Sequence, residues 1–344
     1  MKVSFSSVCK QAHHSFLNFF PSATGIINRE RPFNPIRRKE KVVFVMGPTG
    51  TGKSRLSIDL AHRFPSEIIN SDKMQVYKGL DIVTNKVTKE EQQGIPHHLL
   101  GVINPDADFS AEDFRHHASL AVESIVDRNL LPIIVGGSNS FIEALVNESS
   151  PNLLQFRSKF DCCFLWVDVS LPVLHSFVSD RVDRMVDSGL VDEVRAMFKP
   201  DADYGSGIRR AIGVPEMDRF LRAELAGVDD DETRARLLVT AIDKIKANTC
   251  SLARHQLSKI HRLRDLLGWC IHRIDATEMF LRRGEETDVA WEKQVMGPAA
   301  SIVWSFLHQR SEDADRAIVT STPKIPSLAI TTTVLATAVA AATR

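Results

Sequence analysis

Apolar and polar residues alternate in a regular order through the middle of the chain. Residues 42–46 are all apolar and predict a buried strand, and residues 53–63 follow a helical pattern. Further apolar runs predict strands at residues 67–70, 131–135 and 163–169, with a helix over residues 110–127. That helix opens on Ser110 and Asp113, which have the spacing of a capping box. Strands separated by helices predict an α/β fold whose mostly parallel sheet is wrapped by helices.

Helical patterns dominate the second half of the chain. They predict helices over residues 173–186, 193–198 and 231–267, and residues 269–274 fit one last strand. The C-terminal half is therefore expected to be rich in helix.

The two ends of the chain differ from the middle. Residues 1–39 contain seven Lys or Arg against one acidic residue, with several serines. Such a composition is typical of an organelle transit peptide, although a disordered basic leader has the same appearance. Residues 301–344 become rich in Ala, Thr and Ser and predict a disordered tail. The folded domain is accordingly expected over residues 40–300.

Composition narrows the class of protein further. The 344 residues include 43 basic and 43 acidic side chains, so no overall charge attracts nucleic acid or an anionic membrane. No apolar run reaches the roughly 18 to 20 residues that span a bilayer. The five cysteines show neither a CxxC pair nor zinc spacing, which fits a reducing compartment.

The first strand runs into a glycine-rich motif that matches G-x-x-x-x-G-K-[ST]. The motif comprises Gly47, Pro48, Thr49, Gly50, Thr51, Gly52, Lys53 and Ser54. Its glycines let backbone amides wrap a phosphate, Lys53 neutralises phosphate oxygens, and Ser54 can ligate Mg²⁺. The P-loop identifies a phosphate site, but it serves a kinase as well as an enzyme that releases diphosphate.

Two more strands are predicted to end in polar residues at the same sheet edge. Asp72 follows the second strand, where a carboxylate can accept a proton from a nucleophile or cap a helix. Ser138 follows Gly136 and Gly137, where its hydroxyl can contact substrate or cap the helix over residues 141–146.

The order of these motifs resembles one enzyme family. The segments GPTGTGKS, NSDKMQVYKGLDIVTNK, PHHLLG, LPIIVGGSNSFIEAL, FLWVDVSLPVL and GIRRAIGVPEMD, spread over residues 41–298, are similar to isopentenyltransferases. The last two segments resemble the plant adenylate isopentenyltransferases in particular. The resemblance implies transfer of a dimethylallyl group from its diphosphate to N6 of adenine in ATP or ADP, with AMP a poorer acceptor. This reaction is the first step of cytokinin biosynthesis, and the P-loop would hold the leaving diphosphate.

The same resemblance implies roles for individual residues. Asp72 matches the base, Lys53 assists departure of the diphosphate together with Mg²⁺ at Ser54, and Ser138 supplies a hydroxyl near the amine. Arg209 and Arg210 are candidates for phosphate contacts, with two solvated charges as the alternative. One departure concerns LARHQ, since relatives carry LACRQ: His255 stands at the usual arginine, and Arg254 is about 100° away around the helix.

Other features of the sequence predict the acceptor of the prenyl group and the cellular compartment of the protein. Only residues 147–162 separate the third helix from the next strand, which leaves no room for the helical insertion of tRNA-modifying relatives. We therefore expect small-molecule substrates, dimethylallyl diphosphate and ATP or ADP, and neither nucleic acid nor membrane as partner. Plastid delivery is expected, with mitochondrion or cytosol as alternatives, and the oligomeric state stays open. The other readings are a tRNA dimethylallyltransferase, a P-loop kinase and a nucleotide-sensing scaffold.

Overall fold

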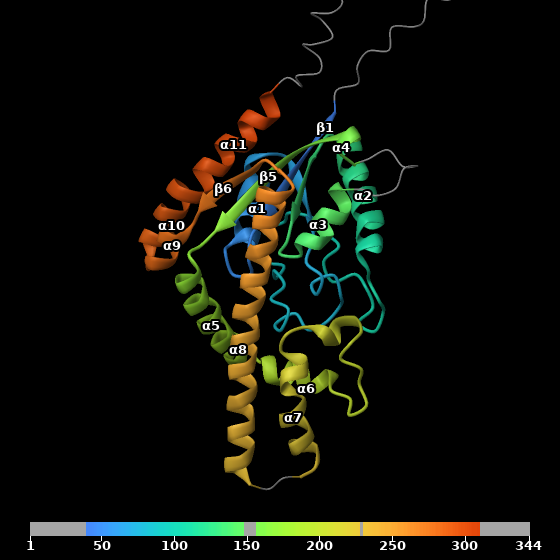
Figure 1. Cartoon of the computed structure of the whole chain (residues 1–344), viewed down its shortest axis with the longest axis vertical. Coiled ribbons are helices and arrows are strands. Elements are labelled where there is room, and N and C mark those ends of the chain that lie inside the picture. The colour runs from blue at the N-terminus through green and yellow to red at the C-terminus, as the bar shows by residue number, and fades with distance from the viewer. Residues whose placement is uncertain (1–38, 148–155, 228–229, 310–344) are drawn as a thin grey trace, which may run out of the picture. The chain divides into compact units, whose positions relative to one another are not determined.

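The computed structural model describes residues 39–147, 156–227 and 230–309 (Figure 1). The expected leader lies outside these ranges except for Lys39, and so does the expected tail beyond residue 309. Residues 301–308 belong to helix α11 (Gly297–His308), so helix continues past the boundary expected at residue 300. Within the described ranges, no helix is both long enough and apolar enough to cross a membrane.

One sheet organises the described part of the chain. Its six strands lie in the order β3-β2-β4-β1-β5-β6, and each neighbouring pair is parallel. The carboxyl ends of β1, β2 and β4 therefore meet at one edge, which confirms the predicted α/β class. The strands are β1 (Glu40–Met46), β2 (Ser66–Asn70), β3 (His97–His98), β4 (Leu131–Val135), β5 (Phe160–Asp168) and β6 (Ile271–Asp275).

A few strand bounds differ from the sequence predictions. Strand β5 begins already at Phe160, because β1 pairs with it from Glu40 onward. Strand β3 was not predicted, since two residues are too few to show a period.

The two faces of the sheet carry separate hydrophobic cores. Phe44 and Trp166 belong to the core that includes α2 (Ala111–Asp127) and α3 (Asn139–Val146). Val45 and Leu165, which are adjacent to Phe44 and Trp166 on the same strands, belong to the core with α1 (Lys53–Arg63) and α11. Because side chains alternate along a strand, both faces of β1 and β5 are apolar and buried, as helices on both faces require.

Helices follow β5 for most of the remaining chain, as predicted. The long α8 packs on α7 and α5 and also reaches α3 (Figure 1). With the π-helical segment that follows, α8 accounts for the helix predicted over residues 231–267. The elements are α4 (Phe156–Lys159), α5 (Leu171–Asp187), α6 (Leu190–Met197), a 3₁₀ turn (Gly207–Arg210), α7 (Val214–Leu225), α8 (Asp231–His261), a π segment (Arg262–Leu266), α9 (Thr277–Leu281), α10 (Glu285–Trp291) and a second π segment (Glu292–Met296).

Candidate active site

The glycine-rich turn between β1 and α1 is held in a single, tightly packed conformation. Gly50 has a φ of +86°, in the left-handed region that favours glycine. A Cβ atom on Gly50 would lie 2.6 Å from the Val178 Cγ1 atom of α5. The loop therefore lies directly between α5 and the N-terminus of α1, where helix amides favour an anion.

Lys53 is the first residue of α1 and points back over this loop. Its ammonium donates a hydrogen bond of 2.7 Å to the Pro48 carbonyl oxygen. The pKa of Lys53 is lowered to about 8, chiefly by burial; the Asp72 carboxylate raises it and the Arg181 guanidinium lowers it. The charges of Asp72 and Arg181 therefore both act on the Lys53 ammonium.

Asp72 stands immediately after β2 and is fixed by its neighbours. Its Oδ1 atom accepts a 2.9 Å hydrogen bond from the Met74 amide, and its own amide donates to the Asn70 Oδ1 atom at 3.1 Å. A Cβ on Gly136 would lie 2.8 Å from the Asp72 nitrogen and 2.3 Å from Ser71 Oγ. The glycine after β4 therefore lets the Asp72 turn approach the strand end closely. Because a turn follows Asp72, the alternative that it caps a helix is wrong.

Ser138 joins the loops after β2 and β4. It occupies the N-cap position of α3 but makes no side-chain cap hydrogen bond there. Instead, its hydroxyl oxygen accepts from the Lys73 amide at 3.0 Å. Ser138 therefore anchors the backbone next to Asp72, and the capping alternative does not hold.

These loops surround a small cavity of about 250 Å³ at the carboxyl edge of the sheet. Six of the thirteen expected site residues line it: Thr49, Gly50, Gly52, Lys53, Ser54 and Asp72. The other seven do not: Gly47, Pro48, Thr51, Ser138, Arg209, Arg210 and Arg254.

Two lining residues were missed by the sequence analysis. Arg181 of α5 donates a 3.0 Å hydrogen bond to Thr49 Oγ1, and burial lowers its pKa to about 10. Gln256 of α8 is buried and accepts from the Thr49 amide at 2.7 Å through Oε1. Both helices thus hold the same loop residue, and α5 adds a second cation beside Lys53.

A larger cavity of about 1110 Å³ adjoins the small one. Five residues line both cavities: Ser54, Asn85, Val87, Leu100 and Arg181. The rest of the large cavity is formed mainly by α1, α5 and the segment of residues 78–93.

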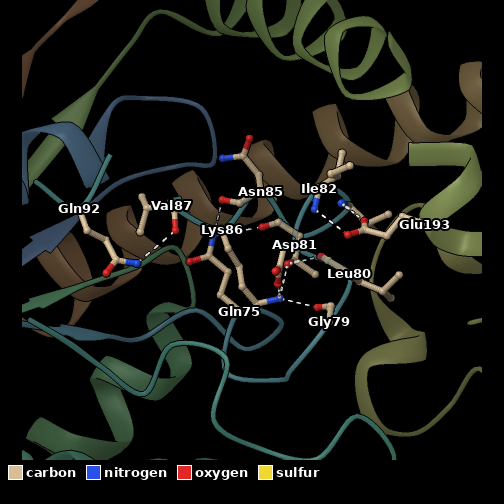
Figure 2. Close-up of polar contacts among 12 residues, drawn as sticks. Gln75, Gly79, Leu80, Asp81, Ile82, Asn85, Lys86, Val87, Gln92 and Glu193 are labelled. Carbon is tan, nitrogen blue, oxygen red and sulfur yellow. Dashed lines mark hydrogen bonds and ion pairs between the residues drawn. The ribbon is translucent and has the colours of Figure 1, made fainter. Parts of the chain in front are cut away.

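Polar contacts fix that segment (Figure 2). The Lys86 ammonium, whose side chain is 6% exposed, donates to the Gly79 carbonyl oxygen at 2.6 Å and pairs with Asp81 at 2.9 Å. Glu193 of α6 accepts from the amides of Ile82 and Val83 at 3.0 Å and 2.8 Å. A carboxylate on two amides and a buried lysine leave the segment little freedom.

The two arginines of GIRRAIG separate in the structure. Arg209 forms an ion pair with Asp106. Arg210 donates to the Tyr77 hydroxyl at 3.2 Å and contributes, with Lys259, to a lowered pKa of Lys73; the first cause of that lowering is burial. The Lys73 ammonium lies 5.1 Å from the centre of the Phe141 ring. The charges of Arg210 and Lys259 thus both act on Lys73, the residue that follows Asp72.

A family model described as IPP transferase matches residues 75–158 and 149–262. Adenylate isopentenyltransferase 5, chloroplastic, of Arabidopsis thaliana is 65% identical over 79% of this chain and 81% of its own length. The chain belongs to the isopentenyltransferase family. An adenylate isopentenyltransferase of Humulus lupulus is 46% identical over 77% of this chain and 90% of its own. A crystal structure of a eukaryotic dimethylallyltransferase acting on tRNA superposes with a TM-score of 0.65 at 25% identity, covering 79% of this chain and 81% of that one.

Within this isopentenyltransferase, α8 contacts the loop through Gln256 and not through its neighbours. Arg254 and His255 are both exposed. Neither has a hydrogen bond or ion pair to the residues described here. The expectation that Arg254 binds phosphate receives no support, because the buried stripe of α8 runs through Ala253, Gln256 and Ile260, and Gln256 is its contact with the loop.

Substitutions on the buried and on the exposed face of α8 should differ in their effect on activity. We expect Gln256→Leu to lower kcat/KM for the prenyl donor about tenfold, because the Thr49 amide loses its acceptor and a net hydrogen bond is worth about 1 kcal/mol. Arg254→Ala should stay within about twofold of the unmodified enzyme. Steady-state kinetics with varied donor measure both, and equal losses in the two variants would contradict the assignment.

Proposed function

We propose that this isopentenyltransferase moves a dimethylallyl group from dimethylallyl diphosphate to N6 of adenine in ATP or ADP and releases diphosphate, the first step of cytokinin biosynthesis. One observation carries the proposal. Lys53, Arg181 and Asp72 all line one small cavity, so two cations for a leaving diphosphate and a carboxylate for an incoming amine are available in the same place.

The chemistry follows from these charges. The lone pair of the adenine amine is delocalised into the ring, so removal of a proton by Asp72 strengthens the nucleophile as the carbon–nitrogen bond forms. Lys53, Arg181 and the loop stabilise the charge that develops on the departing diphosphate. Ser138 keeps the backbone beside Asp72 in place.

Mg²⁺ is proposed as the cofactor, and Ser54 fits it. The serine lines both cavities, and its hydroxyl makes no hydrogen bond to the residues that the structure describes. A hydroxyl oxygen next to phosphate oxygens is a usual Mg²⁺ environment. When bound, the ion would offset negative charge on the leaving group.

The acceptor phosphates are assigned to the cluster of Lys73, Arg210 and Lys259. Burial and the charges of Lys259 and Arg210 lower the pKa of Lys73, and a polyanion bound there would offset these positive charges. ATP or ADP would neutralise these cations better than AMP. This assignment keeps the expected phosphate role for Arg210, whereas Arg209 is already paired with Asp106.

A free nucleotide is favoured over tRNA as the acceptor. A relative called tRNA dimethylallyltransferase 2 of Arabidopsis thaliana is only 35% identical, and the charge of this chain is balanced. Relatives with names ending in chloroplastic or mitochondrial support delivery to the plastid, with the mitochondrion as the alternative.

Product analysis tests the function directly. The protein is incubated with Mg²⁺, dimethylallyl diphosphate and either ATP, ADP or unmodified tRNA, and products are separated by mass spectrometry. We expect ATP and ADP to gain one C5 unit with release of diphosphate. Prenylation of tRNA alone would replace the acceptor, and transfer of the ATP γ-phosphate without any prenylated product would favour a kinase.

The pKa of Lys53 predicts a pH dependence. Because the pKa of this lysine is lowered to about 8, the free enzyme loses the ammonium as pH rises through that value. We therefore expect kcat/KM for the donor to fall above about pH 8, since the neutral amine cannot offset the diphosphate charge. Lys53→Arg stays charged and should remove this falling limb from the profile. An identical limb in both proteins would exclude Lys53 as its origin.

A further inference from the structure

Two apolar side chains lie where the small cavity and the large one meet. Among the five residues that line both cavities, Val87 and Leu100 are the apolar ones, and they come from the segments before and after β3. The small cavity measures about 250 Å³ and the large one about 1110 Å³. Truncating Val87 and Leu100 would therefore widen the connection between the two cavities.

Apolar surface for the prenyl tail of the donor is available at this boundary. If the diphosphate lies on the glycine-rich loop, as the proposed function requires, the reacting carbon lies between Lys53 and Asp72. The remaining carbons then need apolar surface away from those charges. Val135 and Phe177 line only the small cavity, whereas Val87 and Leu100 supply apolar surface where it meets the large one.

We propose that Val87 and Leu100 form a partition that limits the donor to one five-carbon unit, and that opening it admits the ten-carbon allylic diphosphate. The inference rests on the proposed function. The small cavity excludes the second isoprene unit, because the partition occupies the place which that unit would take. The large cavity that adjoins it offers apolar contacts from Ile58 and Ile82.

Hydrogen bonds fix the backbone next to Val87 and Leu100, so moving either residue aside would break them. The Gln92 side-chain Nε2 atom donates to the Val87 carbonyl oxygen at 3.4 Å (Figure 2). On the other side, the carbonyl oxygen of Leu99 accepts from Asn70 at 2.9 Å, and the Gly101 amide donates to the Gln75 carbonyl oxygen at 2.9 Å. Both partition residues are thus next to anchored peptide groups.

The chemistry with a longer donor is unchanged. The bond between C1 and the diphosphate oxygen breaks, and its electron pair leaves with diphosphate. The bond between C1 and the adenine N6 forms, and the amine proton passes to Asp72. Only the volume beyond C5 decides between donors.

The test is the double variant Val87→Ala, Leu100→Ala, assayed with ATP, Mg²⁺ and either dimethylallyl or geranyl diphosphate. The two truncations remove about five carbons, as many as one isoprene unit contains, and leave a void of that size. We expect the kcat/KM ratio of geranyl over dimethylallyl donor to rise at least about tenfold, the usual range for a methylene-scale change in an apolar pocket. Mass spectrometry distinguishes a C10 from a C5 gain on the nucleotide.

Met185→Ala is the matched control, because Met185 lines only the large cavity. In this variant, the kcat/KM ratio of geranyl over dimethylallyl donor should stay within about twofold of the ratio in the unmodified protein. The single variants Val87→Ala and Leu100→Ala should give intermediate ratios, which keeps the test decisive if the double variant does not fold.

Two results would overturn the partition. One is dimethylallyl transfer retained in the single and double variants with an unchanged ratio, and the other is geranyl transfer by the unmodified protein. Failure of the unmodified protein to transfer the dimethylallyl group would instead overturn the proposed function, and with it the partition.

Discussion

Replacing Asp72 with asparagine is expected to lower kcat for prenyl transfer by about 10²–10⁴-fold, the range that a positioned general base contributes. The amide cannot accept the proton of the adenine amine. It can still accept the hydrogen bond that Met74 donates, so the turn after β2 should keep its shape. Steady-state measurement of prenylated nucleotide with both substrates varied should show the loss mainly in kcat.

A second readout separates chemistry from structure. The Asp72 carboxylate raises the pKa of Lys53, so its removal should shift the falling limb of the pH profile to lower pH. Asp59→Asn is the matched control: Asp59 lines only the large cavity, and asparagine can still accept from the Trp291 indole at 2.7 Å. The kcat of the Asp59→Asn enzyme should stay within about threefold of the unmodified enzyme. Full turnover by the Asp72→Asn enzyme would remove Asp72 from the mechanism.

The parts of the site that the sequence predicted are those attached to strand ends. An apolar strand followed by a glycine-rich turn fixes the position of Lys53 relative to the sheet, and the same logic places Asp72 after β2. Parallel strands bring such ends to one edge whatever their order in the chain. Hence the cavity between Lys53 and Asp72 could be expected before any coordinates were known.

Residues that reach the site from helices were harder to predict. Arg181 lies three residues after Val178 and seven after Leu174, both buried, so it is a charged residue beside the apolar stripe of α5. Gln256 lies on the buried stripe of α8 between Ala253 and Ile260. A polar residue on such a stripe signals a buried partner, but only the tertiary fold shows that the partner is Thr49.

Arg254 illustrates the limit of a sequence argument on a helix. The sequence shows that Arg254 stands next to the family's usual arginine position and about 100° away around the helix. The stripe through Gln256 faces the loop, and Arg254 is exposed. Charge type alone could not decide this, because the direction of a side chain depends on which face of α8 is buried.

Arg181→Gln is expected to lower kcat/KM for the donor by about 10²–10³-fold, the loss found when one preorganised donor to a developing anion is removed. Arg181 brings a second positive charge to the loop and is fixed there by Thr49 Oγ1 at 3.0 Å. The substitution also removes the charge that lowers the pKa of Lys53, so the falling limb should shift to higher pH, opposite to the shift expected for Asp72→Asn.

The conservative variant and a neighbour complete this test. Arg181→Lys should recover part of the activity, because it restores the charge without the planar guanidinium. Arg184 lines only the large cavity, so Arg184→Gln should stay within about threefold of the unmodified enzyme. Equal losses in the Arg181→Gln and Arg184→Gln enzymes, or an unmoved limb in the former, would mean that Arg181 supports the fold and does not stabilise the leaving group. A selective loss with the limb moved upward requires that the guanidinium acts on the diphosphate itself, because only a charge next to Lys53 changes both.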